Sequence, residues 1–263
     1  MKAEFAVIGG TGVYNPRMLT DLQELTIDTQ YGEVSLKTGR IKEKKVVFLA
    51  RHGSKHSVPP HQINYRANIM ALKKLGVKKI IATAAVGSLS EKMAPGQLVV
   101  LDQFIDFTKG RTQTFYEGGE KGVLHIDMTH PYCPELAQTI IDVCPPTIDL
   151  HQKGTYVCTE GPRFETPAEI KMFKMWGGDI VGMTSVPEVV LARELGICYG
   201  SIAMITNYAA GISALPLTHK EVVETMALNT HNLQALIMEI LINLDTRQEC
   251  LCPIANQEAG NLG

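Results

Sequence analysis

Short apolar runs alternate with longer segments of helical spacing along most of the chain. The runs predict buried strands over residues 4–10, 45–50, 79–85, 97–101, 155–158, 179–183 and 197–206. Helix-forming or amphipathic segments between them predict helices over residues 64–75, 134–143, 166–175, 187–195 and 222–244. Strands that alternate with helices in this way predict an α/β fold, in which a twisted mixed β-sheet is flanked by helices on both faces.

A single domain is predicted over residues 1–246, because no linker, repeat or low-complexity segment divides the chain. Residues 247–263 are more polar and carry a C-x-C motif at Cys250 and Cys252. We expect them to form a mobile C-terminal tail.

Composition excludes several classes of protein. The chain of 263 residues has 25 basic and 27 acidic side chains, a net charge of −2. It therefore lacks the excess of basic residues that is typical of proteins that bind nucleic acid. There is no window of 18 or more apolar residues, so no membrane partner is expected. The N-terminal segment MKAEFAVIGGTG has glycines where a signal peptide would have a cleavage site. A cytoplasmic location is therefore expected.

The cysteines are scattered along the chain, at Cys133, Cys144, Cys158, Cys198, Cys250 and Cys252. They form no C-x-x-C pair and no Cys/His ligand spacing, so a zinc site is not expected and no metal ligand is assigned. The C-x-C motif has two interpretations: a plain pair of thiols, or a redox-active or stabilising disulfide.

Polar groups follow several predicted strands at the point where each strand ends, namely Thr11, Arg51 and His52, Ala85 in TAAVGS, Thr184, and Asn207. Ligands of open α/β sheets lie at the carboxyl ends of strands, so these groups are expected to converge. A glycine turn with a hydroxyl, combined with a guanidinium, suits phosphate. A dinucleotide-binding turn would need a third glycine where Asn15 stands, which disfavours a nicotinamide-dependent oxidoreductase. A tight turn and a surface ion pair remain the simpler alternatives for Thr11 and Arg51.

Six motifs in order carry a family resemblance: GGTGVY, LARHG, PPHQINYRAN, DQFID, EGPRFET and GMTSVPEVVLARELGICYGSIAMITN. Together they resemble the trimeric nucleoside phosphorylases, the family of purine nucleoside phosphorylase and methylthioadenosine phosphorylase, from about Phe5 to about Leu244. The resemblance implies reversible phosphorolysis in purine salvage, with inorganic phosphate as co-substrate and neither metal nor organic cofactor. It also implies self-association as a homotrimer or as a dimer of trimers.

The same resemblance implies a role for each matched residue. The phosphate would be held by Thr11, Arg51, His52, Thr184 and the backbone N–H of Ala85. Met183 would pack under the ribose, Phe164 would stack on the purine, and His125 would reach into the neighbouring subunit's site. Asn207, Glu165 and His52 are the candidate catalytic residues. Ala84 departs from the family pattern, because relatives have a polar Thr or Asn there, and phosphate affinity is expected to be lower.

The base and the sugar are inferred from three side chains. An ionised Glu165 only accepts hydrogen bonds, which suits the N1–H of a 6-oxopurine, and Asn207 can donate to purine N7 or O6. Adenine-specific relatives carry Ser and Asp at these two positions. His219 matches a histidine that binds the 5′-hydroxyl, whereas methylthio-specific relatives have an apolar residue there. Inosine and guanosine are therefore the expected substrates, and methylthioinosine or methylthioadenosine is the alternative. The alternatives are a surface role for His219, a helix-terminal role for Glu165 and a non-catalytic nucleoside-binding protein.

Overall fold

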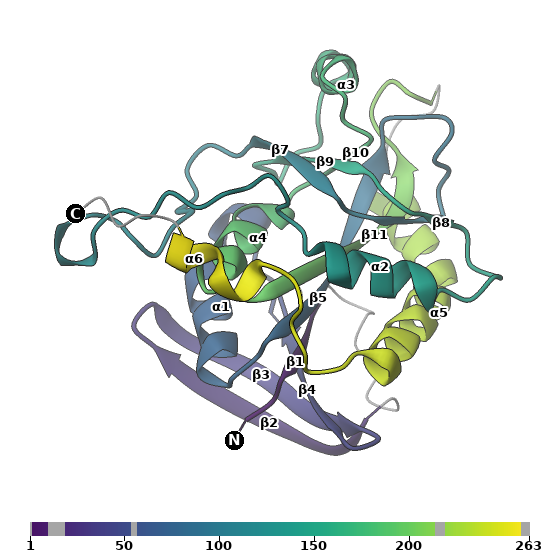
Figure 1. Cartoon of the computed structure of the whole chain (residues 1–263). Helices are drawn as coiled ribbons and strands as arrows, with labels where there is room; N and C mark the ends of the chain where they lie inside the picture. Colours follow the sequence, from purple (N-terminus) through teal and green to yellow (C-terminus); the bar gives the residue numbers. More distant parts are fainter. Residues whose placement is uncertain (1, 10–18, 54–56, 214–218, 259–263) are drawn as a thin grey trace.

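The structure is a computed structural model that describes residues 2–9, 19–53, 57–213 and 219–258 (Figure 1). Its strands are β1 (Phe5–Gly9), β2 (Thr20–Thr29), β3 (Gly32–Ile41), β4 (Lys44–Ala50), β5 (Lys79–Ser88), β6 (Leu98–Val100), β7 (Gln103–Phe107), β8 (Leu150–His151), β9 (Thr155–Thr159), β10 (Ile180–Gly182) and β11 (Cys198–Tyr208). The helices are α1 (Tyr65–Lys74), α2 (Pro134–Asp142), α3 (Pro167–Met175), α4 (Ser185–Glu194), α5 (His219–Asn243) and α6 (Ala255–Glu258), with short 3₁₀ turns η2 (Pro60–Gln62), η3 (Gly119–Lys121) and η4 (Cys252–Ile254). The predicted α/β class is confirmed.

The central strands are buried on both faces, which explains why they are continuously apolar in the sequence. In β4, Val47 and Leu49 face one hydrophobic core, whereas Val46 and Phe48 face another. The first core includes side chains of α1 and α4, and the second includes side chains of α2 and α5. The two helix pairs therefore cover opposite faces of the sheet, as Figure 1 shows.

The sheet is mixed and forks at β5. Its main order is β2-β3-β4-β1-β5-β10-β9-β7, and β11 pairs with β5 on the other edge. β1 pairs in parallel with β5 only as far as Ala82, and β10 pairs antiparallel with β5 only at Gly87 and Ser88. Among the described residues, positions 83–86 therefore have no strand partner on the edge that β1 and β10 share.

The first residues of α3 and α4 explain where these two helices begin. Thr166 caps α3 in a capping box with Glu169, and Pro167 occupies the first turn. Val186 departs from helical geometry inside α4, so its regular part begins near Pro187, where the sequence predicts the helix start. The starts of both helices are therefore defined by local sequence.

The C-terminal segment forms hydrogen bonds with the rest of the domain. The backbone N–H groups of Glu249 and Cys250 donate to the Glu135 carboxylate at 3.1 and 3.2 Å. The Asn256 amide donates to the Glu194 carbonyl at 3.3 Å, and α6 lies beside α4 in Figure 1. Residues 249–256 therefore include several that contact the domain, and the mobility of the tail stays a prediction. Among the helices in the described part of the chain, none is long and apolar enough to cross a bilayer.

Candidate active site

A cavity of about 550 Å³ lies where β5, β10 and β11 end, beneath one side of α5. Most of the predicted site residues line it: Arg51, His52, Ala85, Phe164, Glu165, Met183, Thr184 and Asn207. The wall from α5 is largely apolar and consists of Val222, Val223, Met226, Ala227, Thr230 and Leu233. Segments far apart in the sequence are therefore brought together, with β5 and β11 reaching the cavity in parallel and β10 running antiparallel to β5.

Arg51 lines this cavity, is buried and forms a bidentate ion pair with Glu188. Its Nε donates to Oε2 at 2.8 Å and its Nη2 to Oε1 at 2.6 Å, while Nη1 donates to the Thr83 carbonyl at 2.8 Å. Burial alone lowers the pKa of Arg51, but the Glu188 carboxylate outweighs this and raises it above the usual range, so the cation is permanent. These contacts use three of the five guanidinium N–H groups, which leaves two for a ligand.

The unpaired edge of β5 directs backbone groups toward Arg51. The backbone groups of a strand alternate between its two edges, and Lys79 and Leu89 donate on the β1/β10 edge, to Glu4 and Asp179. The Thr83 carbonyl also faces this edge, where Arg51 contacts it. Because residues two apart direct their backbone groups to the same edge, the N–H of Ala85 also points to the unpaired edge at positions 83–86. This supplies a backbone donor without any side chain.

Thr184 lies at the N-terminal end of α4 and is 7% exposed. Its backbone N–H donates to the Tyr156 hydroxyl at 3.2 Å. His52 is positioned by a hydrogen bond between its Nδ1 and the Val58 carbonyl at 2.8 Å. Thr184 and His52 thus lie in the same cavity wall as Arg51 and can offer a hydroxyl and an imidazole to a ligand.

Glu165 also lines the cavity and is 9% exposed. Burial raises the pKa of its carboxyl group, and a hydrogen bond from the Thr159 hydroxyl to Oε1 at 2.6 Å works in the opposite direction. Phe164 precedes it, is 40% exposed and lines the same cavity. The pair offers an aromatic face and a hydrogen-bond acceptor to a planar base.

Asn207 lies in a bulge of β11, where the pairing with β5 shifts register between Ile205 and Asn207. Its Oδ1 accepts from the Thr206 hydroxyl at 2.8 Å, and its Nδ2 donates to the Tyr208 carbonyl at 2.9 Å. One N–H of the amide remains for a ligand. Gly87 on the facing strand makes room, because a Cβ there would lie 3.1 Å from Nδ2.

Three predicted residues are not brought into this arrangement by the described part of the structure. Thr11 lies outside the described residues. His219 begins α5, but its side chain is not among the described ones. His125 is exposed, in a segment without helix or strand, and does not line the cavity. Their roles stay predictions.

Sequence reasoning missed the supports beneath the site. Glu188 is fully buried and accepts both from Arg51 and from the Tyr199 hydroxyl, the latter at 2.7 Å. Arg111 donates to the carbonyls of Met183 and Val186, each at 2.7 Å, and so fixes the turn that carries Thr184. The only available signal was the placement of Glu188 within the motif that also contains Thr184.

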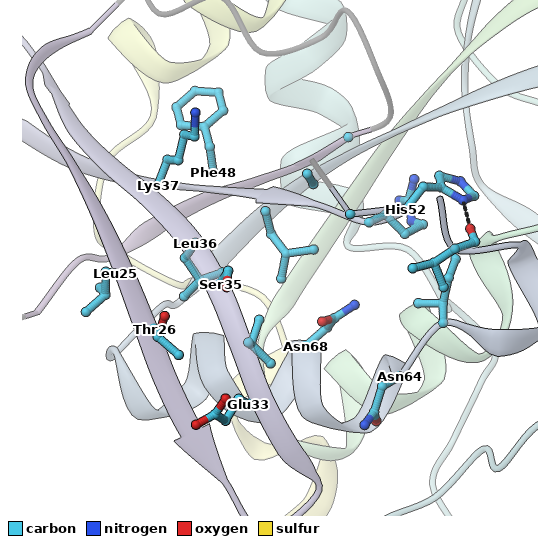
Figure 2. A pocket seen from close by; sticks show the side chains of 18 of the residues that line it. Leu25, Thr26, Glu33, Ser35, Leu36, Lys37, Phe48, His52, Asn64 and Asn68 are labelled. Atoms are coloured by element: carbon cyan, nitrogen blue, oxygen red, sulfur yellow. Dashed lines mark hydrogen bonds between the residues drawn. The ribbon is translucent and has the colours of Figure 1, made fainter. Parts of the chain in front are cut away.

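A second cavity of about 860 Å³ adjoins the first and shares Arg51 and His52 with it. Figure 2 shows it between the β2–β3 hairpin, with Glu33 and Lys37, and the start of α1, with Asn64. Residues 10–18 and 54–56 come next to its lining in the chain and are not described. We assign no ligand to this cavity.

The α/β fold, with a mixed sheet flanked by helices, is that of nucleoside phosphorylases of known structure. A crystal structure of methylthioadenosine phosphorylase from an antarctic soil metagenomic library superposes with a TM-score of 0.90 at 36% identity, covering 98% of this chain and 92% of the other. The Phosphorylase superfamily matches residues 4–242. The chain belongs to this superfamily.

Three relatives with high sequence similarity have substrate-specific names. A probable 6-oxopurine nucleoside phosphorylase from Moorella thermoacetica is 54% identical, with 95% of this chain and 96% of the relative covered. The 6-oxopurine nucleoside phosphorylase of Pyrococcus furiosus is 50% identical, with 94% and 95% covered. A probable S-methyl-5′-thioinosine phosphorylase from Methanocaldococcus jannaschii is 49% identical, with 96% and 98% covered.

Proposed function

We propose that the protein catalyses the phosphorolysis of the 6-oxopurine ribonucleosides inosine and guanosine to free base and ribose 1-phosphate. One observation carries the proposal: Glu165 and Asn207, an acceptor and a donor, line the same cavity as the buried cation Arg51. A 6-oxopurine offers the complementary N1–H donor with N7 and O6 acceptors. The names of the two phosphorylase relatives from Moorella thermoacetica and Pyrococcus furiosus support this choice of base.

The phosphate is assigned to the Arg51 end. The two remaining guanidinium N–H groups, the Ala85 backbone N–H and the start of α4 at Thr184 provide directional donors there. Thr11 and His52 complete the proposed set. No organic cofactor is proposed, since inorganic phosphate is itself the nucleophile.

In the reaction, a phosphate oxygen attacks C1′ as the C1′–N9 bond breaks, and the bonding electron pair departs with the purine. Positive charge grows on the sugar, next to the phosphate that Arg51 holds. Negative charge grows on the base, where the remaining Asn207 N–H donates to N7 and the ionised Glu165 accepts from N1–H. Met183 packs under the ribose and Phe164 against the purine, so the reacting atoms are held in line.

Methylthioinosine is the second candidate substrate. The α5 wall of the cavity presents Val222, Val223 and Met226, which suit an apolar 5′-methylthio group better than a hydroxyl. The Methanocaldococcus jannaschii relative has the corresponding name. His219, at the start of the same helix, is the residue proposed to favour the hydroxyl.

A homotrimer or a dimer of trimers is proposed as the working assembly, located in the cytoplasm. Phe164 is 40% exposed beside the cavity, and His125 is exposed away from it. A neighbouring subunit that brings its own His125 over Phe164 would close the cleft on this side.

The test is phosphate-dependent base release from inosine, guanosine, methylthioinosine and methylthioadenosine at equal concentrations. Faster release from inosine and guanosine supports the proposal. Preference for methylthioinosine would agree with the proposed roles of Glu165 and Asn207, but it would show that the preferred sugar carries a 5′-methylthio group. Preference for methylthioadenosine overturns the assignment of the base.

A further inference from the structure

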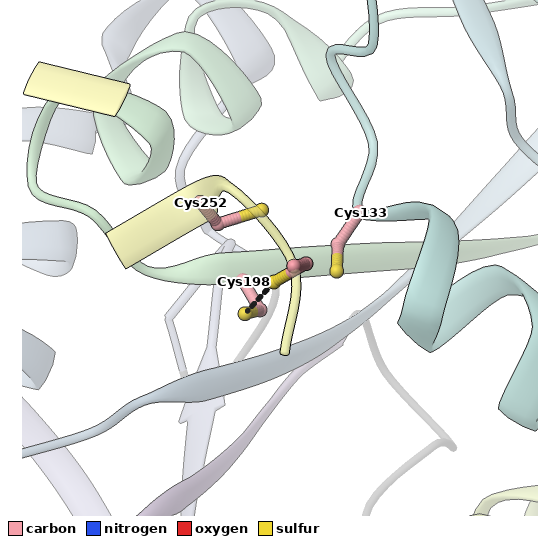
Figure 3. A group of neighbouring side chains, drawn as sticks. Cys133, Cys198 and Cys252 are labelled. Carbon is pink, nitrogen blue, oxygen red and sulfur yellow. Dashed lines mark hydrogen bonds between the residues drawn. The ribbon is translucent and has the colours of Figure 1, made fainter. Parts of the chain in front are cut away.

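Buried polar side chains outside the cavity lining differ in how close they lie to the cleft. The sulfur atoms of Cys133, Cys198, Cys250 and Cys252 lie within 4.8 Å of one another, a grouping that their scattered positions in the sequence do not predict (Figure 3). Cys198 and Asn207 are nine residues, or about 30 Å, apart along β11, so no part in ligand binding is assigned to these cysteines. Arg111, by contrast, contacts segments that form the cleft.

Arg111 joins two of these segments, although its own side chain does not line the cavity. That side chain is 2% exposed. Its Nη1 donates to the carbonyls of Met183 and Val186, each at 2.7 Å. Its Nη2 donates to the carbonyls of Thr159 and Glu160 at 3.1 and 2.7 Å. One guanidinium thus connects the end of β9 to the turn between β10 and α4.

The two connected segments carry groups that are assigned to different substrates. The chain continues from the end of β9 to Phe164 and Glu165, which are proposed to bind the base, and the Thr159 hydroxyl donates to Glu165 at 2.6 Å. The turn after β10 carries Met183 and Thr184, which are proposed to contact ribose and phosphate. The relative position of the base and phosphate subsites therefore depends on two nitrogens of one planar group.

A third segment reaches the same guanidinium through a hydroxyl group. Arg111 Nη1 donates to the Tyr65 hydroxyl at 3.3 Å, and this hydroxyl donates to the Pro60 carbonyl at 3.0 Å. Pro60 lines the cavity. Gly161 lies between the segments, since a Cβ there would be 2.6 Å from the Met183 sulfur and 3.5 Å from Pro60 Cγ. The junction around Arg111 therefore has no space for an added methyl group.

These contacts require an arginine rather than any cation. A guanidinium carries its donors on separate nitrogens of a rigid plane, whereas a lysine presents all three donors from one atom. Lysine therefore cannot face the two pairs of carbonyls at once. The Glu160 carboxylate lies 3.3 Å from Arg111 Nε and balances the buried charge. Arg111→Lys would keep the charge but release one of the two segments.

We propose that Arg111 is a positioning residue that sets the base subsite relative to the phosphate subsite without touching either substrate. This inference rests on the proposed function for the roles of the two subsites. Phosphorolysis needs a phosphate oxygen in line with the C1′–N9 bond, and a displacement of about 1 Å can cost about 10²-fold in rate. Loss of Arg111 therefore lowers turnover and leaves each subsite able to bind its own ligand.

The test compares turnover with binding in Arg111→Lys. With whichever of the four nucleosides the wild type cleaves fastest, kcat is expected to fall about 10²-fold. Dissociation constants of inorganic phosphate alone and of hypoxanthine alone, measured by isothermal titration calorimetry, should stay within about threefold of the wild type. A rise in the KM of one substrate with kcat unchanged would overturn the proposal.

Lys44→Met is the matched control, because Lys44 also holds backbone carbonyls but lies outside the cavity lining. Its Nζ donates to the carbonyls of Leu241 and Ile242, at the end of α5, at 3.0 and 2.6 Å. The control variant should melt at a lower temperature and keep the wild-type kcat. If Arg111→Lys behaves in the same way, its side chain has only a structural role and the proposal is wrong.

Hydrogen exchange measured by mass spectrometry gives a readout that does not depend on activity. In Arg111→Lys, the amides of residues 159–165 and 183–187 should exchange faster together, and in Lys44→Met they should stay protected. Faster exchange in only one of the two segments would overturn the proposal. Absence of base release by the wild type would instead refute the proposed function, and the exchange comparison would still decide the role of Arg111.

A second variant disturbs the same junction with Arg111 intact. Gly161 and Gly177 both have positive φ, of 66° and 89°, but only a Cβ at Gly161 meets another group within 4 Å. Gly161→Ala should reproduce the fall in kcat with both ligands still bound, and Gly177→Ala should keep wild-type kinetics. If Arg111→Lys does not fold, this pair decides the question alone: equal kcat in the two glycine variants would exclude the proposed positioning.

Discussion

Arg51 and Glu188 form a side-on ion pair that is sealed from solvent, with side-chain exposures of 2% and 0%. Glu188 comes from α4, and Arg51 follows β4, so the pair joins two elements that are 137 residues apart in the chain. It fixes the plane of the guanidinium and leaves its remaining N–H groups facing the cavity. The orientation of this cavity-lining cation thus depends on a carboxylate that is not among the residues lining the cavity.

Replacement of this carboxylate is expected to destabilise the protein strongly. Glu188→Gln leaves the buried Arg51 charge uncompensated, a change that costs about 3–5 kcal/mol of unfolding free energy. Denaturant unfolding checks this. Glu117→Gln is the control, because Glu117 pairs with Arg66 near the surface, where the expected cost is below about 1 kcal/mol. Equal losses in the two variants would contradict a buried, charge-bearing pair.

The acid limb of the pH profile is expected to report Glu165. Only its ionised form accepts from N1–H, so kcat/KM for inosine falls as pH drops through the raised pKa of this carboxyl group. Thr159→Val removes a hydrogen bond that favours the ionised form. The limb should therefore move to higher pH in this variant. An unchanged limb would show that another group controls it.

Asn207 is expected to act on the leaving base rather than on phosphate. Asn207→Asp removes the donor aimed at N7 and should lower kcat for inosine by about 10²–10³-fold, while KM for phosphate changes little. Steady-state kinetics with each substrate varied in turn measures both. Asn243→Asp, at the exposed end of α5, serves as control and should keep wild-type constants. A rise in phosphate KM alone would contradict the assignment.

A pair of glycines tests how firmly the C-terminal segment is seated. Gly196 and Gly177 both have positive φ, of 68° and 89°. A Cβ at Gly196 would approach the Pro253 carbonyl oxygen at 3.2 Å, whereas nothing lies within 4 Å of one at Gly177. Both Ala variants incur about 1–2 kcal/mol of backbone strain. Gly196→Ala should lose more stability and expose the C-terminus to carboxypeptidase; equal behaviour would indicate a loosely held segment.

The buried strands and most cavity residues were predictable because apolar runs and the polar residues after them are contiguous in sequence. The β2–β3 hairpin was missed for a local reason. Its register shifts between Thr20 and Gln23, so Leu22 lies outside the two-residue spacing that Leu25 and Ile27 keep, and β2 is largely exposed. Contacts between distant segments left no local signal at all. Glu188 looks like an ordinary helical carboxylate, and Cys133 is far in sequence from Cys250.

At the fork, one edge of β5 has no strand partner over positions 83–86, and this unpaired edge forms part of the cleft. In the proposed reaction, an oxyanion accepts the hydrogen bond from the Ala85 N–H that a carbonyl oxygen of a further strand would otherwise accept. Co-substrate binding and completion of backbone hydrogen bonding are then the same event. The amide of Ala85 would gain protection from hydrogen exchange only while phosphate is bound. A longer β1 or β10 would satisfy that edge permanently, at the expense of activity.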